Sequence, residues 1–122
     1  MEKPKKVGLI DSKVISALKL SIKEGTPIFL GSSNIAHMKS RHPAEYEKYG
    51  ADIPLILSYP DYIGINKKDN SIEYVKEYKI DNEYVEVAVR VSHTNNYFAR
   101  SIYTLNKNRV KNFITKGTLK VP

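Results

Sequence analysis

The chain has 122 residues, with 20 Lys and Arg against 13 Asp and Glu, which gives a formal net charge of +7 at pH 7. This length suits one globular domain, so we expect a single domain over residues 1–122. The absence of cysteine excludes disulfides, thiolate metal ligands and cysteine nucleophiles. No apolar run approaches the roughly 20 residues of a membrane-spanning helix, so we expect no membrane partner. The positive charge is compatible with three polyanions, namely nucleic acid, the surface of an acidic membrane and an acidic protein inhibitor, and of these we favour nucleic acid.

The first half of the chain has the composition of short strands and helices that follow one another closely. Asp11 and Ser12 are common N-cap residues, and Gly25 is of the type found just after a helix. Pro43 disfavours helical geometry at the residue before it and should end the helix that contains His37. We therefore expect extended segments at 5–10 and 27–30, and helices between Ser12 and Gly25, at 33–41, at 44–49 and at 53–57.

The second half changes to the two-residue period of strands. Residues 84–92 alternate four valines with more polar residues, which predicts a strand with one apolar and one polar face. Asn106 is suited to cap a last helix that ends at Gly117. Helices followed by strands indicate an α+β fold, with N-terminal helices packed on a roughly four-stranded antiparallel sheet and a C-terminal helix. The expected strands are 62–65, 71–80, 84–92 and 97–105.

The segment from His37 to Pro43, with the sequence HMKSRHP, holds the residues best suited to acid–base chemistry. At about 100° per residue, His37 and Arg41 lie about 40° apart on one helix face, and Asn34 lies about 60° from His37. A histidine exchanges protons near neutral pH, and an arginine one turn away grips a phosphate with two donors. These groups suffice for RNA transphosphorylation, in which a ribose 2′-hydroxyl attacks the neighbouring phosphate. The alternative is a helix with solvated polar residues, in which His42 is only a turn residue.

The polar face of the strand at 84–92 is a candidate floor for a cleft. Arg90 and Ser92 share this face because side chains alternate along a strand. His93 follows at the turn and is a second candidate for proton transfer. The alternative is an idle histidine in a polar hairpin.

The strand at 97–105 has no cleanly apolar face, although one face of a half-buried strand usually is apolar. Such inconsistency is common where a strand contributes to a site. The alternative is an ordinary edge strand. The alternation places Arg100, Ile102 and Thr104 on one face, and Ser101 and Tyr103 on the other.

These residue types suggest, as a hypothesis, a catalytic role for each residue. His37 is the general base on the 2′-hydroxyl, and arginines hold the scissile phosphate. The leaving 5′-oxygen is assisted by His42 or by a hydroxyl of Tyr103 or Ser101. No histidine spacing typical of a metal site is present, so we expect neither metal nor cofactor. The predicted catalytic residues are His37, Arg41, His42, Arg100, Ser101 and Tyr103, and the predicted substrate-binding residues are Asn34, Arg90, Ser92 and Thr104.

The run from Gly31 to Pro43 resembles the phage-associated branch of the barnase–EndoU–colicin–RelE (BECR) superfamily. Its HM-x-x-RHP motif is the most specific part of the likeness. The match covers about residues 25–117. Three further blocks agree, namely Ile56-Leu57 through Pro60-Asp61-Tyr62-Ile63, then residues 85–90, then residues 99–103.

The resemblance implies an α+β fold with N-terminal helices against a four-stranded antiparallel sheet, and metal-independent RNA cleavage that leaves a 2′,3′-cyclic phosphate. It assigns His37 as the helix histidine, Arg41 as the phosphate-binding arginine, and Arg100 with Ser101 as the strand pair. Such domains occur in phage and mobile-element proteins and in the C-terminal regions of toxins.

We therefore expect a toxin- or effector-type endoribonuclease that acts in the bacterial cytosol, either free or delivered as part of a phage or secreted protein. RNA, with tRNA as one candidate, is the expected substrate, and an acidic immunity or antitoxin protein is a candidate partner. A non-catalytic RNA-binding module and a protein-interaction domain are the alternatives.

Overall fold

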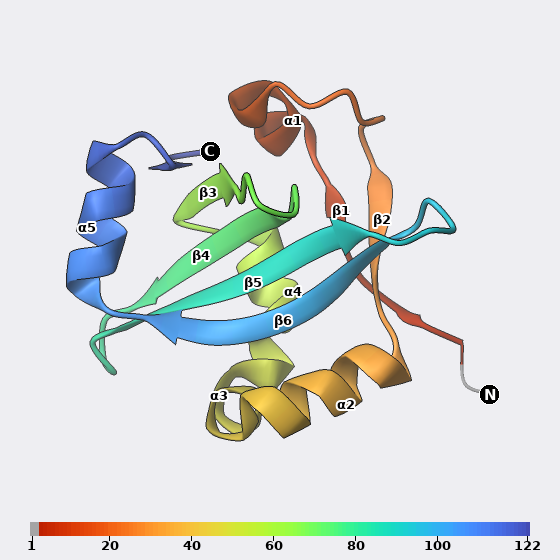
Figure 1. The fold of residues 1–122 in the computed structure, drawn as a ribbon, viewed down its shortest axis with the longest axis horizontal. Coiled ribbons are helices and arrows are strands. Elements are labelled where there is room, and N and C mark those ends of the chain that lie inside the picture. The colour runs from red at the N-terminus through yellow and green to blue at the C-terminus, as the bar shows by residue number, and fades with distance from the viewer. Residues whose placement is uncertain (1–2) are drawn as a thin grey trace.

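The computed structural model describes residues 3–122, and Figure 1 shows how their strands and helices are arranged. The strands are β1 (Lys5–Ile10), β2 (Thr26–Leu30), β3 (Tyr62–Ile65), β4 (Ile72–Tyr78), β5 (Glu83–Val91), β6 (Tyr97–Leu105) and β7 (Leu119–Lys120). The helices are α1 (Ser12–Leu18), α2 (Ser32–Arg41), α3 (Pro43–Tyr49), a 3₁₀ turn (Gly50–Asp52), α4 (Ile53–Ser58) and α5 (Lys107–Thr115). No helix within residues 3–122 is long and apolar enough to cross a membrane.

The strands form one seven-stranded mixed sheet in the order β1-β2-β6-β5-β4-β3-β7. The expected antiparallel meander is present as β3 to β6, but the prediction of about four strands was wrong for the whole sheet. The first two strands join the meander through β2, which runs parallel to β6 and pairs Ile28 with Tyr97 and Phe29 with Phe98. A pairing between segments so far apart along the chain leaves no local pattern in the sequence, and β7 has only two residues.

The two faces of the sheet differ in how far helices cover them. Val85, Val87 and Val89 on β5 are fully buried in the main core, together with apolar residues of α1, α3 and α4. The opposite face carries a smaller cluster in which Val110 and Phe113 of α5 take part. Figure 1 shows α5 beside the ends of β4 to β6, so that much of this second face is left without a covering helix. Several polar residues of the strands, among them Glu73, Glu86 and Ser101, lie on this second face.

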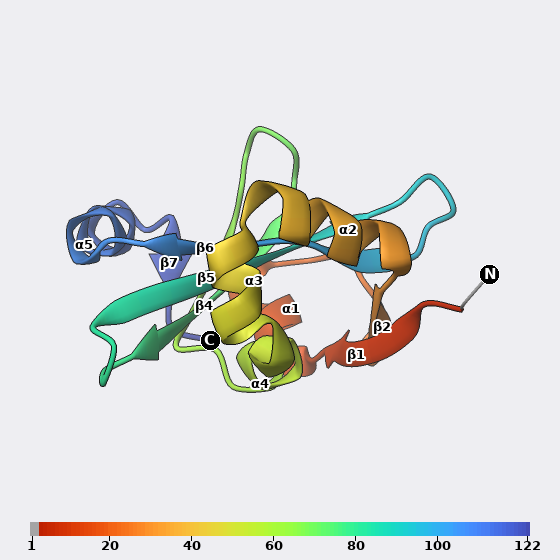
Figure 2. The ribbon, with the colours of Figure 1, turned by 90° about the horizontal axis from the view of Figure 1, so that it is seen from below.

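Helices α2 and α3 run beside β6, at the edge of the meander (Figures 1 and 2). Only Tyr97 and Phe98 of β6 pair with β2, so the remainder of β6 pairs on one side alone, with β5. Met38 is fully buried and anchors α2 in the core, while His37 next to it is exposed. The edge of β6 is thereby covered by a helix that presents polar residues beside the second face of the sheet.

Local sequence explains where the helices begin and end. The Asp11 carboxylate accepts a hydrogen bond from the backbone N–H of Val14 at 2.9 Å, and Asn106 caps α5 in the same way. Pro43 occupies the first turn of α3, where a missing N–H costs nothing. Helix α1 ends at Leu18 rather than near Gly25, because Lys19 takes the left-handed conformation with φ of 54°.

Candidate functional site

A cavity of about 390 Å³ lies where the N-terminal half of α2 approaches the second face of the sheet. Five of the predicted site residues line it, contributed by one helix and two paired strands. We call it the histidine cavity. Its lining residues are Ser33, Asn34, His37, Asp69, Ser71, Ala88, Arg90, Arg100 and Ser101.

The helix side of the histidine cavity is fixed by the start of α2. The Asn34 side-chain oxygen accepts a hydrogen bond from the backbone N–H of Gly31 at 2.9 Å, which closes the first turn. This bond occupies the Asn34 oxygen and holds its side chain at the cavity wall. One turn later His37 is exposed and lines the same cavity, as the helical spacing predicts.

Arg90 reaches the opposite wall from β5 and meets the loop between β3 and β4. Its Nη1 lies 3.4 Å from Oδ2 of Asp69, and Oδ1 of Asp69 accepts a hydrogen bond from the backbone N–H of Ser71 at 3.0 Å. The hydrogen bonds from Ser71 lower the pKa of Asp69 below its ordinary value, and the charge of Arg90 lowers it further. Asp69 is therefore ionised at neutral pH and holds the arginine at the rim.

A bulge in β6 places Arg100 in the cavity. Ala88 pairs with Ser101, whereas Val89 pairs with Ala99, so Arg100 is the extra residue of the bulge. Simple alternation predicted Arg100 on the face opposite Ser101, and that prediction was wrong because a bulge re-aims a side chain. Arg100 and Ser101 therefore line the same cavity.

Five predicted residues are not brought into this cavity: Arg41, Ser92 and Thr104, and the pair His42 and Tyr103 described below. Arg41 is exposed at the end of α2 and does not line the histidine cavity. Ser92 lies in the β5–β6 hairpin, where its hydroxyl contacts the Thr94 hydroxyl at 2.6 Å. Thr104 pairs with Val85 and so belongs to the face opposite Ser101. The alternative candidate His93 is exposed in the same hairpin.

His42 and Tyr103 form a pair of their own. Their ring centroids lie 5.8 Å apart, and Nδ1 of His42 lies 3.6 Å from a carboxylate oxygen of Glu45. His42 joins α2 to α3, which accounts for its position against β6. The pair lies outside the histidine cavity, although Tyr103 lines the neighbouring one.

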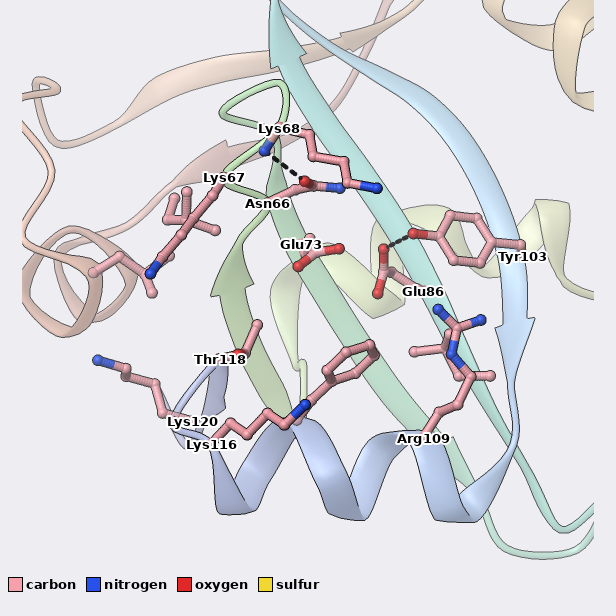
Figure 3. A pocket seen from close by; sticks show the side chains of 15 residues that line it. Asn66, Lys67, Lys68, Glu73, Glu86, Tyr103, Arg109, Lys116, Thr118 and Lys120 are labelled. Carbon is pink, nitrogen blue, oxygen red and sulfur yellow. Dashed lines mark hydrogen bonds between the residues drawn. The ribbon is translucent and has the colours of Figure 1, made fainter.

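The neighbouring cavity, of about 620 Å³, lies between the second face of the sheet and α5 (Figure 3). We call it the carboxyl cavity because Glu73 of β4 and Glu86 of β5 both line it, and the Tyr103 hydroxyl donates a hydrogen bond to Glu86. Glu86 is only 2% exposed. Five basic residues also line the carboxyl cavity: Lys67, Lys68, Arg109, Lys116 and Lys120.

The carboxyl pair has unusual electrostatics. Burial raises the pKa of Glu86 to about 9, and the adjoining Glu73 carboxyl contributes to the increase. The hydrogen bond from Tyr103 and the charge of Arg109 act in the opposite direction. Glu86 is therefore mainly protonated at neutral pH. Burial and the Glu86 carboxyl also raise the pKa of Tyr103, so its hydroxyl keeps its proton.

Sequence reasoning missed Glu73, Glu86 and Arg109 as site residues. One feature could have revealed Glu86. It is a glutamate between Val85 and Val87, in the most apolar part of its strand, and should be either buried with partners or functional. Glu73 and Arg109 are ordinary polar residues in sequence. Only the sheet register and the position of α5 bring them to Glu86.

The two cavities adjoin along the strands. Ala88 and Glu86 are two positions apart on β5, and each lines a different cavity. The same relation holds between Ser101 and Tyr103 on β6. A step of two residues along a strand spans about 6.8 Å, so the cavities form one continuous polar tract on the sheet.

This tract combines proton-transfer groups with fixed cations. The His37 imidazole is the proton-transfer group, and Arg90 and Arg100 offer planar sets of donors for phosphate oxygens. Hydroxyl groups of Ser101 and Tyr103 line the floor. Within residues 3–122, no group of three or more His, Asp or Glu side chains is arranged to hold a metal ion.

Comparison with known proteins agrees with the sequence motif. The family model described as phage-Barnase-EndoU-ColicinE5/D-RelE like nuclease3 matches residues 5–112. No curated protein and no solved structure shows significant similarity to the chain. The matched residues include every residue that lines the histidine cavity. The chain therefore belongs to the phage-associated barnase–EndoU–colicin–RelE-like nuclease family.

Proposed function

We propose that this protein is a metal-independent endoribonuclease that cleaves RNA by transphosphorylation. The ribose 2′-oxygen forms a bond to the neighbouring phosphorus, and the bond from phosphorus to the 5′-oxygen breaks. The products are a 2′,3′-cyclic phosphate and a free 5′-hydroxyl. One observation carries the proposal: a histidine of α2, an arginine of β5, and an arginine and a serine of β6 line one cavity.

His37 takes the proton from the attacking 2′-hydroxyl. It is exposed on a helix anchored by Met38, so it can accept this proton and return it to solvent. Its position on a rigid helix fixes the distance between base and substrate better than a loop would.

Arg90 and Arg100 bind the scissile phosphate and stabilise the charge that develops on its oxygens in the transition state. Asp69 restrains Arg90, and the bulge of β6 directs Arg100 to the same cavity. Asn34 and Ser101 supply further hydrogen bonds to the substrate. Arg41 lies farther along α2 and can contact the RNA backbone outside the cavity.

The leaving 5′-oxygen takes a proton from a hydroxyl of the sheet floor. Ser101 lies in the histidine cavity, and Tyr103 lies one step along β6. The Tyr103 ring is supported by His42, and the Tyr103 hydroxyl keeps its proton at neutral pH and so has one to give. Parallel assays of Tyr103→Phe and Ser101→Ala distinguish them, because loss of the true donor slows a substrate with a poor leaving group much more than one with a good leaving group.

The decisive experiment incubates the purified protein with total tRNA in EDTA. We expect cleavage with 2′,3′-cyclic phosphate ends, and a loss of about 10²–10⁴-fold in rate for His37→Ala. Complete loss of cleavage in EDTA would overturn the metal-independent mechanism. Full activity of His37→Ala would overturn the role of His37.

A matched pair of substrates isolates the chemistry. An oligonucleotide with a single ribose should be cut only after that residue, and its all-deoxy counterpart should remain intact because it lacks the nucleophile. His93→Ala is the control, because His93 is exposed in the β5–β6 hairpin and lies outside the proposed site. Binding of the all-deoxy strand without cleavage of either would favour a non-catalytic nucleic-acid-binding module instead.

In the cell, we propose that the enzyme acts as a toxin or effector on RNA in the bacterial cytosol. The net charge of +7 supports both a polyanionic substrate and an acidic immunity or antitoxin protein that would cover the same tract. Growth arrest on expression, relieved in His37→Ala, is the expected result. Normal growth with the active enzyme present would contradict a toxin role.

A further inference from the structure

The carboxyl cavity shares only Tyr103, one of the two candidate proton donors, with the cleavage chemistry proposed above. It adjoins the histidine cavity along β5 and β6, because Glu86 and Ala88, like Tyr103 and Ser101, are two residues apart on one strand. Its volume of about 620 Å³ lies within the range of small-molecule sites. The space is therefore large enough for one nucleotide, and it lies one strand step from the position proposed for the scissile phosphate.

The floor of this cavity is built to make hydrogen bonds. Glu86 is 2% exposed and lines the cavity with Glu73, which belongs to the neighbouring strand. Figure 3 shows the two carboxyl groups turned toward each other across the floor, with Tyr103 beyond Glu86. Two adjacent carboxyl groups do not readily ionise together, so the pair offers hydrogen-bond acceptors without a double negative charge.

The walls suit a stacked base and a phosphate. Tyr103 and Phe113 line the cavity, and unpaired RNA bases stack on aromatic rings. Arg109 lies with its guanidinium carbon 5.6 Å from the centre of the Phe113 ring. In Figure 3 the side chain of Arg109 extends toward the carboxyl pair, and Lys116 and Lys120 project from the same side. The cavity thus pairs a polar floor with a cationic rim.

We propose that the carboxyl cavity is a subsite for the nucleotide that flanks the dinucleotide around the scissile phosphate. The basic rim binds the phosphate of this nucleotide, and the Glu73–Glu86 pair accepts hydrogen bonds from the exocyclic amino group of its base. Adenine, cytosine and guanine carry such an amino group, whereas uracil does not. The inference rests on the proposed RNA substrate. It adds that the protein recognises the base of one particular nucleotide of that RNA.

The basic rim argues for a nucleotide over other small ligands. Five basic residues line the cavity with only two carboxyl groups, and an anion is therefore favoured at the rim. A free metal ion is disfavoured by the same cations. A bulky protein partner would have no access to a buried floor.

The experiment uses the full-length protein and short oligoribonucleotides of 2′-O-methyl residues, which bind but cannot be cleaved. A dinucleotide is compared with trinucleotides that are extended on the 5′ side or on the 3′ side. We expect extension on one side to lower the Kd by about tenfold for an amino-bearing base, and by clearly less for uracil. Equal affinity for all lengths, or an equal gain on both sides, would overturn the subsite.

Two variants on α5 test the rim with the same change of charge. Arg109→Gln should abolish the gain from extension while leaving the dinucleotide Kd within about twofold. Lys111→Gln on the same helix is the control, because Lys111 does not line the cavity. An equal loss in both variants would show only general charge attraction and would overturn the proposal.

Glu73→Gln and Glu86→Gln test the floor with side chains of the same size. Each should remove most of the preference for amino-bearing bases over uracil. Circular dichroism and thermal unfolding confirm that each variant is folded. If either folds poorly, the comparison of Arg109→Gln with Lys111→Gln decides the question, since both residues are exposed.

A matched set of cleavable oligonucleotides, with one ribose at the attacked position, separates the two proposals. Binding with the expected length and base preference but no cleavage would refute the nuclease and leave the subsite in place. Cleavage of the dinucleotide with no effect of extension would refute the subsite and leave the nuclease in place.

Discussion

Arg90 and Asp69 are joined across the rim of the histidine cavity, with Nη1 of the arginine 3.4 Å from Oδ2 of the aspartate. The contact links strand β5 to the loop between β3 and β4, which is otherwise held by turns of its own backbone. It places a carboxylate beside an arginine that we propose to bind phosphate. Asp69 is therefore both a restraint on Arg90 and a competitor for it.

Removing this competitor should strengthen RNA binding. For Asp69→Asn we expect a lower Kd for an uncleavable single strand, and a steeper dependence of log Kd on log salt by about 0.7, because one more cation is free to bind phosphate. The pair is half-exposed, so the change in stability should be below about 1 kcal/mol. Fluorescence anisotropy at several salt concentrations measures the slope. Weaker binding would mean that restraint of Arg90 matters more than its release.

The bulge in β6 brings Arg100 into the histidine cavity, whereas Arg41 lies outside it, so the two arginines should contribute differently to catalysis. Arg100→Ala should lower kcat/KM by about 10- to 100-fold, since a charge-assisted hydrogen bond to the phosphate is lost. Arg41→Ala should have a much smaller effect, because Arg41 lies outside the histidine cavity. Steady-state kinetics on one tRNA substrate compares them. A larger effect at Arg41 would mean that Arg41 of α2 binds the scissile phosphate, as the family resemblance implies.

The buried carboxyl of Glu86 predicts an unusual dependence of stability on pH. Below about pH 4.5 the carboxyl is protonated in both the folded and the unfolded states, but between 4.5 and about 9 only the folded state keeps the proton. The free energy of unfolding should therefore fall as the pH rises through this window, and level off above it. Glu86→Gln should flatten this decline and unfold at a higher temperature than the parent protein at pH 8. Thermal unfolding at pH 5, 7 and 9 tests the difference; parallel curves for both proteins would contradict it.

Gly64 marks the closest approach of β3 to the segment that carries β7. A Cβ atom at this position would lie 2.3 Å from the backbone oxygen of Thr118, which cannot move aside as a side-chain tip can. We expect Gly64→Ala to destabilise the protein by about 1–3 kcal/mol. Urea unfolding measures the loss, and Gly25→Ala is a useful contrast, since its cost arises from a positive φ and not from a clash. An unchanged midpoint for Gly64→Ala would refute the close approach.

Tyr74 is fully buried, and its hydroxyl has no hydrogen-bond partner among residues 3–122. Burying an unpaired hydroxyl is unfavourable, so Tyr74→Phe should raise the free energy of unfolding by about 1 kcal/mol. The ring itself stays in the core and keeps its packing. A loss of stability in Tyr74→Phe would show that the hydroxyl is paired in solution, for instance by a buried water.

Much of the fold was predictable because it is encoded locally. The valine alternation of β5, the Asn106 cap and Pro43 each report on neighbouring residues, and the elements they predict are present. The wider sheet was not predictable in this way. The pairing of Ile28 with Tyr97 depends on contacts between distant segments, and the sequence of neither segment indicates which strand it will pair with.

The residues of the candidate site also fall into two groups, those predictable from local sequence and those that depend on the tertiary structure. His37 and Asn34 follow from helical spacing, and Arg90 follows from strand alternation; all three line the predicted kind of cavity. Arg100 reached it through a bulge that alternation does not foresee. Glu73 and Arg109 required the three-dimensional arrangement of β4 and α5, so sequence reasoning could not have joined them to Glu86.

The parallel pairing of β2 with β6 also sets an order of events during synthesis. Helix α2 leaves the ribosome early, but the floor beneath it is supplied by β5 and β6, which are made much later. Chains fold from the N-terminus as they emerge, and contacts between distant segments form last. A nascent chain stopped before residue 97 would carry His37 on its helix with only part of the cavity around it. The translating ribosome, itself made of RNA, thus completes most of the protein before the histidine cavity exists.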